Sequence, residues 1–282
     1  MRDHVRILEV GPRDGLQNEK TFVPTEQKLK FIENLIAAGL KEIEATAFVS
    51  KKWIPPLADS AELSTQLPRV PGVTYTALVP NLKGYEQAKK FSYDRVSLIL
   101  AVTQSHNQKN LNANTEKAFE RYEQVIAQAK QDKMPFRVYI SCAFGCPYEG
   151  EIDPVQVIKW SKAFYDLGAS ELAISDTIGV GTPEQTRELV KLLLQEFPKD
   201  RLALHLHDTN NRALENCEVA LNLGIRAFDS SAGGIGGCPY APGAKGNVET
   251  ERLVKKLHSL GFETGIDLEK LKEASKALKQ LL

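Results

Sequence analysis

The sequence predicts an α/β protein: a single (β/α)8 TIM barrel with one additional helix at its carboxyl end. The chain has 282 residues, of which 42% are hydrophobic, and one such barrel needs about 250 residues. Short runs of apolar and β-branched residues alternate with longer segments of helical periodicity. Polar side chains gather where the predicted strands end, which is where these barrels carry their active sites. We therefore expect residues 1–282 to form one catalytic domain.

The eight predicted strands are short runs bounded by turn-forming residues. They cover residues 5–10, 42–46, 74–79, 95–101, 136–142, 171–175, 202–207 and 227–231. After the first strand, the segment Gly11-Pro12-Arg13-Asp14-Gly15 lacks the spacing of a dinucleotide-binding phosphate turn. The strand count and this missing motif favour a closed barrel over an open doubly wound sheet.

The predicted helices lie between these strands and after the last one. They cover residues 26–38, a less regular stretch at 57–66, and then 83–91, 116–131, 155–167, 183–196, 212–223, 248–260 and 268–281. Asp153 before Pro154 is a helix start signal, and Thr182 with Gln185 has the spacing of a capping box. The last predicted helix follows the eighth strand–helix unit and is the additional one.

Charge and composition exclude several classes of partner. Lys+Arg and Asp+Glu both total 36, so the net charge is zero and no basic stripe predicts nucleic-acid binding. No apolar run approaches the roughly 20 residues that cross a membrane, and the amino end shows no signal peptide. The four cysteines, at 142, 146, 217 and 238, are too scattered for a disulfide framework. We expect a cytoplasmic protein.

Polar residues cluster at the carboxyl ends of the predicted strands. The set consists of Arg13, Asp14, Glu44, Cys142, Asp176, His205 and His207. Strand side chains alternate, so His205 and His207 point to one face, and Leu202, Leu204 and Leu206 to the other. Two imidazoles on the inner face of a barrel can chelate a divalent ion, whereas the alternative is a pair of hydrogen-bonded core histidines. With oxygen ligands such as Asp14, the ion would be Mg²⁺ or Mn²⁺.

Three of these residues each allow two interpretations. Asp14 precedes Gly15, so it could be a metal ligand or simply form an Asx turn. Arg13 could be its ion-pair partner, or a fixed guanidinium that stabilises a developing enolate. Glu44 could take part in the chemistry, although orienting Arg13 is the role that we favour.

A glycine-rich segment follows the eighth predicted strand, from Gly233 to Gly237. Such glycine density costs backbone entropy, so a static turn rarely uses it. We therefore predict a lid loop at about 233–247 that closes on the substrate and carries Cys238 to it. The alternative is a free cysteine in a flexible loop. Asn247 stands where the last barrel helix should begin, so it is either an N-cap or an oxygen ligand of the metal.

Several motifs together resemble the family of 3-hydroxy-3-methylglutaryl-coenzyme A (HMG-CoA) lyases. They occur in the family's order at residues 9–19 (EVGPRDGLQNE), 43–50 (IEATAFVS), 145–150 (GCPYEG), 175–183 (SDTIGVGTP), 205–209 (HLHDT) and 236–243 (GGCPYAPG). Condensing enzymes of the wider barrel group usually carry a glutamate where this chain has Leu16, which favours a lyase over a Claisen-type acyl-CoA synthase.

The resemblance implies a metal-dependent lyase that cleaves HMG-CoA to acetyl-CoA and acetoacetate, as in leucine degradation and ketone body formation. It implies Asp14, His205, His207 and Asn247 as metal ligands, with Arg13, Cys238, His205 and Glu44 as catalytic residues. Arg13, Gln17 and Asp176 are the expected substrate contacts, and the protein is expected to be a homodimer or a higher homo-oligomer. Some relatives carry a regulatory cysteine near the carboxyl terminus, but this chain has none after Cys238.

Two other functions stay open at this point. A related lyase or aldolase could act on another branched 3-hydroxyacyl-CoA. A non-catalytic barrel that serves as a binding subunit is the more distant alternative, because a binding module does not need Arg, Asp, His, Cys and Asn side chains to converge.

Overall fold

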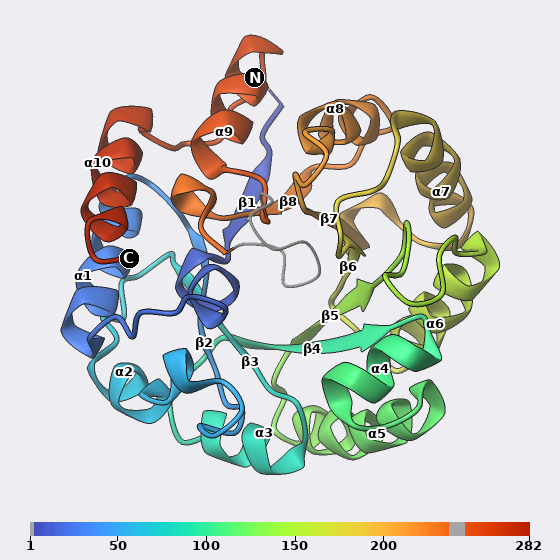
Figure 1. Ribbon diagram of the computed structural model, residues 1–282, viewed down its shortest axis with the longest axis horizontal. Helices are drawn as coiled ribbons and strands as arrows, with labels where there is room; N and C mark the ends of the chain where they lie inside the picture. Colours follow the sequence, from blue (N-terminus) through green and yellow to red (C-terminus); the bar gives the residue numbers. More distant parts are fainter. Residues whose placement is uncertain (1–2, 237–245) are drawn as a thin grey trace.

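The predicted barrel is confirmed by a computed structural model that describes residues 3–236 and 246–282. Eight parallel strands close in chain order, and the helices surround them (Figure 1). The strands are β1 (Arg6–Glu9), β2 (Glu42–Ala47), β3 (Thr74–Leu78), β4 (Arg95–Ala101), β5 (Phe136–Ser141), β6 (Glu171–Asp176), β7 (Leu202–Leu206) and β8 (Ala227–Ser230). Each observed strand end lies within a residue or two of the predicted one.

The outer layer consists of ten α-helices within the described ranges. They are α1 (Thr25–Ala37), α2 (Ser60–Gln66), α3 (Leu82–Ala88), α4 (Gln104–Leu111), α5 (Thr115–Gln131), α6 (Pro154–Asp166), α7 (Pro183–Glu196), α8 (Ala213–Asn222), α9 (Thr250–Ser259) and α10 (Leu268–Lys279). Short helical turns occur at η1 (Gly11–Gly15), η2 (Pro55–Leu57), η3 (Lys199–Arg201) and η4 (Ala232–Gly234). The additional helix, α10, packs on α1 and η4 (Figure 1).

Helix α4 was not predicted from the sequence. Its eight residues, QSHNQKNL, contain one large apolar side chain, so they have no amphipathic pattern. The buried amide of Asn107 holds this helix instead. It accepts a hydrogen bond from the Ala101 backbone N–H (2.9 Å) and donates to the Ala101 carbonyl (2.6 Å) and to the Thr115 hydroxyl (2.8 Å). A tertiary contact therefore takes the place of the missing apolar face.

Alternation along β7 divides its side chains between two cores, as predicted. Leu202, Leu204 and Leu206 are buried in the large core between strands and helices. Ala203 belongs to a smaller cluster inside the barrel, which also contains Ala173, Ala227 and Tyr139. His205 lies on the same inner side as Ala203, two residues further along the strand. The carboxyl end of β7 therefore directs imidazole groups into the barrel.

Charged side chains fill the barrel interior at the end where the strands begin, which we call the base of the barrel. Three arginines and three carboxylates alternate there: Arg6, Arg95, Arg137, Glu42, Glu171 and Asp229. Arg137 is completely buried; its Nε lies 2.9 Å from Glu171, and its two terminal nitrogens each lie 3.0 Å from an oxygen of Asp229. Burial alone would raise the pKa of Asp229, but Arg137 and His205 outweigh it and lower this pKa to about 2. Asp229 is therefore ionised and paired.

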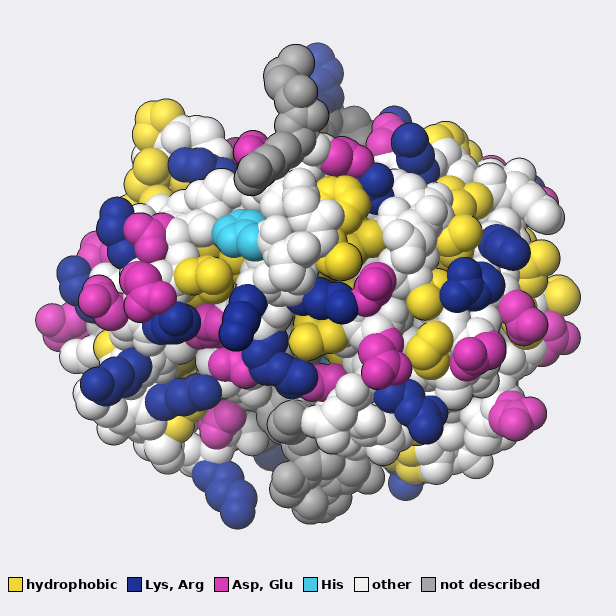
Figure 2. Space-filling view, turned by 90° about the horizontal axis from the view of Figure 1, so that it is seen from above, with side chains coloured by type: hydrophobic (Ala, Val, Ile, Leu, Met, Phe, Trp, Pro, Cys, Tyr) yellow, Lys and Arg dark blue, Asp and Glu magenta, His cyan; other side chains and the backbone are white. Residues whose placement is uncertain are grey.

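The surface agrees with the balanced charge of the chain. Figure 2 shows basic and acidic side chains interspersed over the face that it presents, without a broad area of one sign. Among the described helices, none is long and apolar enough to cross a membrane.

Arg137→Met should lower the free energy of unfolding by about 3–5 kcal/mol, because it leaves two carboxylates buried without their main partner. Urea denaturation of the purified variant measures this loss. Lys272→Met is the matched control: Lys272 pairs with Glu269 on the surface, and its replacement should change the free energy of unfolding by less than about 0.5 kcal/mol. Equal stability of the two variants would contradict a structural role for the buried charges.

Candidate active site

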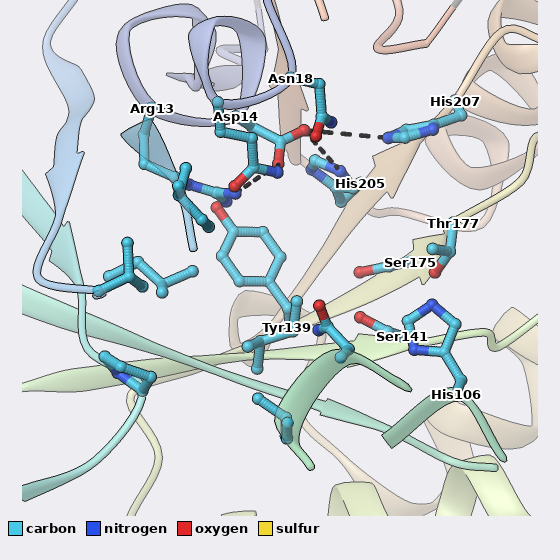
Figure 3. A pocket seen from close by; sticks show the side chains of 18 residues that line it. Arg13, Asp14, Asn18, His106, Tyr139, Ser141, Ser175, Thr177, His205 and His207 are labelled. Carbon is cyan, nitrogen blue, oxygen red and sulfur yellow. Dashed lines mark hydrogen bonds and ion pairs between the residues drawn. The ribbon is translucent and has the colours of Figure 1, made fainter. Parts of the chain in front are cut away.

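A pocket of about 220 Å³ lies at the carboxyl ends of the strands. Its polar lining comes from η1, the following loop, α4 and the ends of β5, β6 and β7 (Figure 3). These polar residues are Arg13, Asp14, Gln17, Asn18, His106, Asn110, Tyr139, Ser141, Ser175, Thr177, His205 and His207. Val49, Ile54, Leu78, Ile99 and Leu111 add an apolar part. The predicted grouping of Arg13, Asp14 and the two histidines is thus present in one pocket.

Asp14 is placed by the wide helical turn η1 directly after β1. The Val10 carbonyl accepts hydrogen bonds from the backbone N–H groups of Arg13, Asp14 and Gly15, which closes the turn. Gly15 is required by packing, because a Cβ there would lie 2.6 Å from Cγ1 of Ile235. The turn therefore sits directly against the segment that follows β8.

The carboxylate of Asp14 and the two histidines form a compact buried cluster. Their potential ligand atoms all lie within 4.8 Å of one another. The Nε2 atoms of His205 and His207 each lie 3.9 Å from Oδ2 of Asp14 (Figure 3). These residues come from the two predicted positions: Asp14 follows β1, and His205 and His207 lie at the end of β7.

The protonation of this cluster suits a divalent cation. Burial would raise the pKa of Asp14, but Arg13 and both histidines lower it below its ordinary range, so the carboxylate is ionised. Burial, with the charge of His205, lowers the pKa of His207 to about 4, so this imidazole is neutral near pH 7. An ionised carboxylate and a neutral imidazole both offer lone pairs to a metal. The residues present therefore fit a divalent metal ion.

Asn247 belongs to this cluster and does not cap a helix. Residues 247–249 run extended between β7 and β8: the Val248 N–H donates to Leu206, and the Val248 carbonyl accepts from Ser231. Helix α9 starts only at Thr250, with Glu249 as its N-cap, so the N-cap interpretation of Asn247 is wrong. Its buried amide instead donates to Oδ2 of Asp14 at 2.8 Å.

Arg13 is held rigidly at the edge of the pocket. Its Nε donates to Glu44 and its Nη1 to Asp14, and its guanidinium carbon lies 5.2 Å from the centre of the Tyr139 ring. Glu44 is fully buried, and its other oxygen accepts hydrogen bonds from Ser97 and from the Tyr139 hydroxyl. Both Glu44 oxygens are thus occupied by protein donors, and the orienting role of Glu44 stays a prediction.

Gln17 and Asp176 differ in their relation to the pocket. Gln17 lines it, and its amide donates to Oδ1 of Asp14 at 2.7 Å. Asp176 does not line it: its carboxylate accepts from the backbone N–H groups of Val180 (3.1 Å) and Gly181 (2.8 Å). Burial raises the pKa of Asp176 to about 6. Asp176 is thus the last residue of β6, and its carboxylate is used by the backbone of the loop that follows the strand.

The comparison with family models supplies the deciding observation. The model described as HMGL-like matches residues 4–278, nearly the whole chain. This chain belongs to the HMGL-like family.

Several relatives of this HMGL-like chain are named as HMG-CoA lyases. It is 47% identical over 278 residues to the mitochondrial hydroxymethylglutaryl-CoA lyase of Macaca fascicularis, covering 99% of this chain and 86% of the relative. The crystal structure of the HMG-CoA lyase from Brucella melitensis superposes with a TM-score of 0.97 at 44% identity, over 99% of both chains. The structure of an HMG-CoA lyase from Acinetobacter baumannii superposes with a TM-score of 0.95 at 38% identity, over 99% of this chain and 91% of the other. That structure is a complex with coenzyme A and 3-methylmalate.

The predicted lid of this HMGL-like chain lies partly outside the described residues. Cys238 is among those outside, so its place and the closure of residues 233–247 stay predictions. The part that is described has a packing reason for glycine: Gly236 has a φ of +90°, and a Cβ there would lie 2.8 Å from the Cα of Gly15. This glycine allows two backbone segments to touch beside Asp14.

Sequence reasoning missed several residues of this HMGL-like site. They are His106, Tyr139, Ser141, Ser175 and Thr177, which line the pocket, and Asp229, whose carboxylate lies 3.2 Å from Nδ1 of His205. Period-two alternation in β5 places Arg137, Tyr139 and Ser141 on the inner face, so this signal was available. No such signal existed for His106, because the polar helix that carries it has no amphipathic pattern.

Proposed function

We propose that this chain is a divalent-metal-dependent carbon–carbon lyase that cleaves HMG-CoA to acetyl-CoA and acetoacetate. The observation that carries the proposal is the cluster of Asp14, His205 and His207 beside a fixed Arg13, in a pocket of an HMGL-like chain. The names of its relatives, at 45–47% identity over 99% of this chain, support the same substrate.

Asp14, His205 and His207 would hold the cation. Asn247, whose amide nitrogen donates to Asp14, would add its side-chain oxygen as a further ligand. A bound Mg²⁺ or Mn²⁺ supplies Lewis-acid polarisation of the C3 hydroxyl of the substrate. The C3 hydroxyl would lose its proton to a base and become the carbonyl of acetoacetate, while the electron pair of the breaking C2–C3 bond would form the thioester enolate. Acetoacetate leaves, and a proton returned to C2 gives acetyl-CoA.

Arg13 would stabilise that enolate. Its guanidinium is fixed by Glu44 and Asp14 and lies close to the Tyr139 ring, so no reorganisation is needed when negative charge develops. The buried Glu44 acts through Arg13, because its oxygens face Arg13, Ser97 and Tyr139. His205, in the cluster, is one candidate for the proton transfers, and Cys238 is the other.

A second polar group in the pocket suits the oxygen-rich acyl part of the substrate. Ser141, Ser175, Thr177 and His106 lie together, away from Arg13 and Asp14 (Figure 3). Burial lowers the pKa of His106 to about 4, so its ring is neutral near pH 7. Neutral donors and acceptors here would orient the acyl group without competing for the cation.

Three further features belong to this proposal. We infer that residues 1–282 act as one catalytic domain, that the protein is a homodimer or a higher homo-oligomer, and that it works in the cytoplasm, in leucine degradation and ketone body formation. Relatives of the same family include both mitochondrial and cytoplasmic enzymes. Sedimentation equilibrium and cell fractionation test the last two inferences, and a monomer or an organelle-bound protein would refute them.

The central experiment measures acetoacetate release from HMG-CoA by metal-stripped protein. We expect no turnover until Mg²⁺ or Mn²⁺ is added, because the hydroxyl is not acidified without it. Full turnover after exhaustive chelation would show that the metal assignment is wrong. A panel of other branched 3-hydroxyacyl-CoA esters tests the substrate, since faster cleavage of another ester would favour the related lyase or aldolase. No cleavage of any ester would favour a binding subunit.

Arg13→Lys should lower kcat by about 10²–10³-fold although the charge is kept. A lysine ammonium cannot reproduce the planar fork that contacts Glu44 and Asp14. Steady-state kinetics at saturating metal measure the effect. Arg252→Lys is the matched control: Arg252 pairs with Asp208 at 2.6 Å and does not line the pocket. If Arg13→Lys raises only the KM, Arg13 binds the ground state and does not stabilise the enolate.

Cys238→Ser should lower turnover by about 10²–10⁴-fold, the range for one positioned proton-transfer group, because a hydroxyl is a much weaker acid than a thiol. Metal affinity should not change. Near-normal turnover of both Cys238→Ser and Cys238→Ala would show instead that this residue only packs the loop.

A further inference from the structure

His205 and His207 share the candidate cation site but differ in what holds them. Nδ1 of His205 lies 3.2 Å from Oδ2 of Asp229, a carboxylate that is 2% exposed. Nδ1 of His207 is buried and has no hydrogen-bond partner among the residues that the structure describes. Both rings direct Nε2 at the same oxygen of Asp14. Within the described part of the chain, His205 therefore has a carboxylate behind its ring and His207 has none.

We propose that Asp229 is a positioning residue: anchored by Arg137, it holds the ring proton of His205 on Nδ1 and so keeps the Nε2 lone pair directed at the cation site. This inference rests on the proposed function only in taking that site to bind a divalent metal. Asp229 is not among the described residues that line this pocket, so it acts through His205.

The first support is the pairing of Asp229 with Arg137. The guanidinium fork donates to both carboxylate oxygens at 3.0 Å, which keeps the carboxylate ionised and fixes its plane. An ionised carboxylate only accepts hydrogen bonds. The hydrogen between it and His205 must therefore be on Nδ1, and in the neutral imidazole the other ring nitrogen then keeps its lone pair.

The second support is that Arg137 itself cannot turn away. Its Nε donates to Glu171 at 2.9 Å, and Glu171 is also held by Arg6 at 2.6 Å. The guanidinium carbon of Arg137 lies 4.8 Å from the centre of the Tyr139 ring. The centres of the Tyr139 and His205 rings lie 5.2 Å apart, with the rings nearly perpendicular. Asp229 and the imidazole are thus confined by rigid neighbours, as expected for a group that sets a ligand's orientation.

The third support is the strand register. Asp229 and His205 are direct partners across the β7–β8 pair. Neighbouring positions on one face of a sheet bring their side chains together without any loop. The contact is therefore part of the barrel itself, and it is present before any metal binds.

The direct test is the tautomer of His205 in metal-free wild-type protein. The chain has five histidines, so ¹⁵N-histidine labelling and long-range ¹H–¹⁵N spectra at about pH 8, above the ordinary histidine range, resolve them. His205→Gln assigns the signal. We expect His205 to be the Nδ1–H tautomer. An Nε2–H tautomer, or an even mixture, would overturn the proposal. The tautomer is read from the wild-type protein and requires no activity, and His205→Gln serves only to assign the signal.

A variant pair tests the consequence for the metal. Asp229→Asn offers both a donor and an acceptor, so the His205 signal should shift toward a mixture, and Mn²⁺ affinity measured by calorimetry should fall about 10–100-fold. Glu42→Gln is the matched control, since it removes a carboxylate charge from the same barrel interior without contacting Arg137 or His205. Its Mn²⁺ affinity should stay within about twofold of wild type.

The outcomes separate this inference from the proposed function. Equal loss of affinity in both variants would mean that Asp229 acts only through general stability, which overturns the positioning role. Wild-type protein that binds Mn²⁺ with the expected tautomer but does not cleave HMG-CoA would refute the proposed function and leave the role of Asp229 intact. Thermal unfolding of both variants checks that each is folded at the temperature of the binding experiment.

Discussion

The guanidinium of Arg137 is a full charge placed inside a barrel, away from solvent, and much of the interior is arranged around it. A buried charge is tolerated only when it is paired and its donors are satisfied. Arg137 meets this condition through Glu171 and Asp229, and those carboxylates are in turn shared with Arg6 and His205. Alanines on neighbouring inner positions, such as Ala173 and Ala203, leave room for this network. The arrangement of side chains at the base of the barrel is therefore determined by electrostatics as much as by apolar packing.

This network connects the base of the barrel with the candidate cation site. Glu171 is the first residue of β6, Arg137 the second of β5, and Asp229 the third of β8, so successive contacts climb the interior toward His205 near the end of β7. Each contact joins rigid strands, which keeps the metal-facing ring in place without help from loops. Catalytic groups held this way need little reorganisation during the reaction.

The opposite side of the site depends on close backbone packing. Asp14 lies on a turn closed by the Val10 carbonyl, and that turn touches the segment after β8 at Gly15 and Gly236. Two glycines are needed because any side chain would push the segments apart. Asn247, extended between β7 and β8, completes this side by donating to Asp14. Residues from the beginning and the end of the chain thus meet where the barrel closes.

The sequence by itself determined the barrel, most element boundaries, and the grouping of Arg13, Asp14, His205 and His207, because alternation and repeated strand–helix units are local signals. Tertiary structure alone decided the rest. Helix α4 depends on the contacts of Asn107 with Ala101 and Thr115 rather than on its own pattern. Asn247 is a neighbour of Asp14 only because residues 247–249 pair with strands on both sides. Asp229 reaches His205 through the register of two strands. Such contacts join residues far apart in the chain, and their positions follow only once eight strands have closed into one ring.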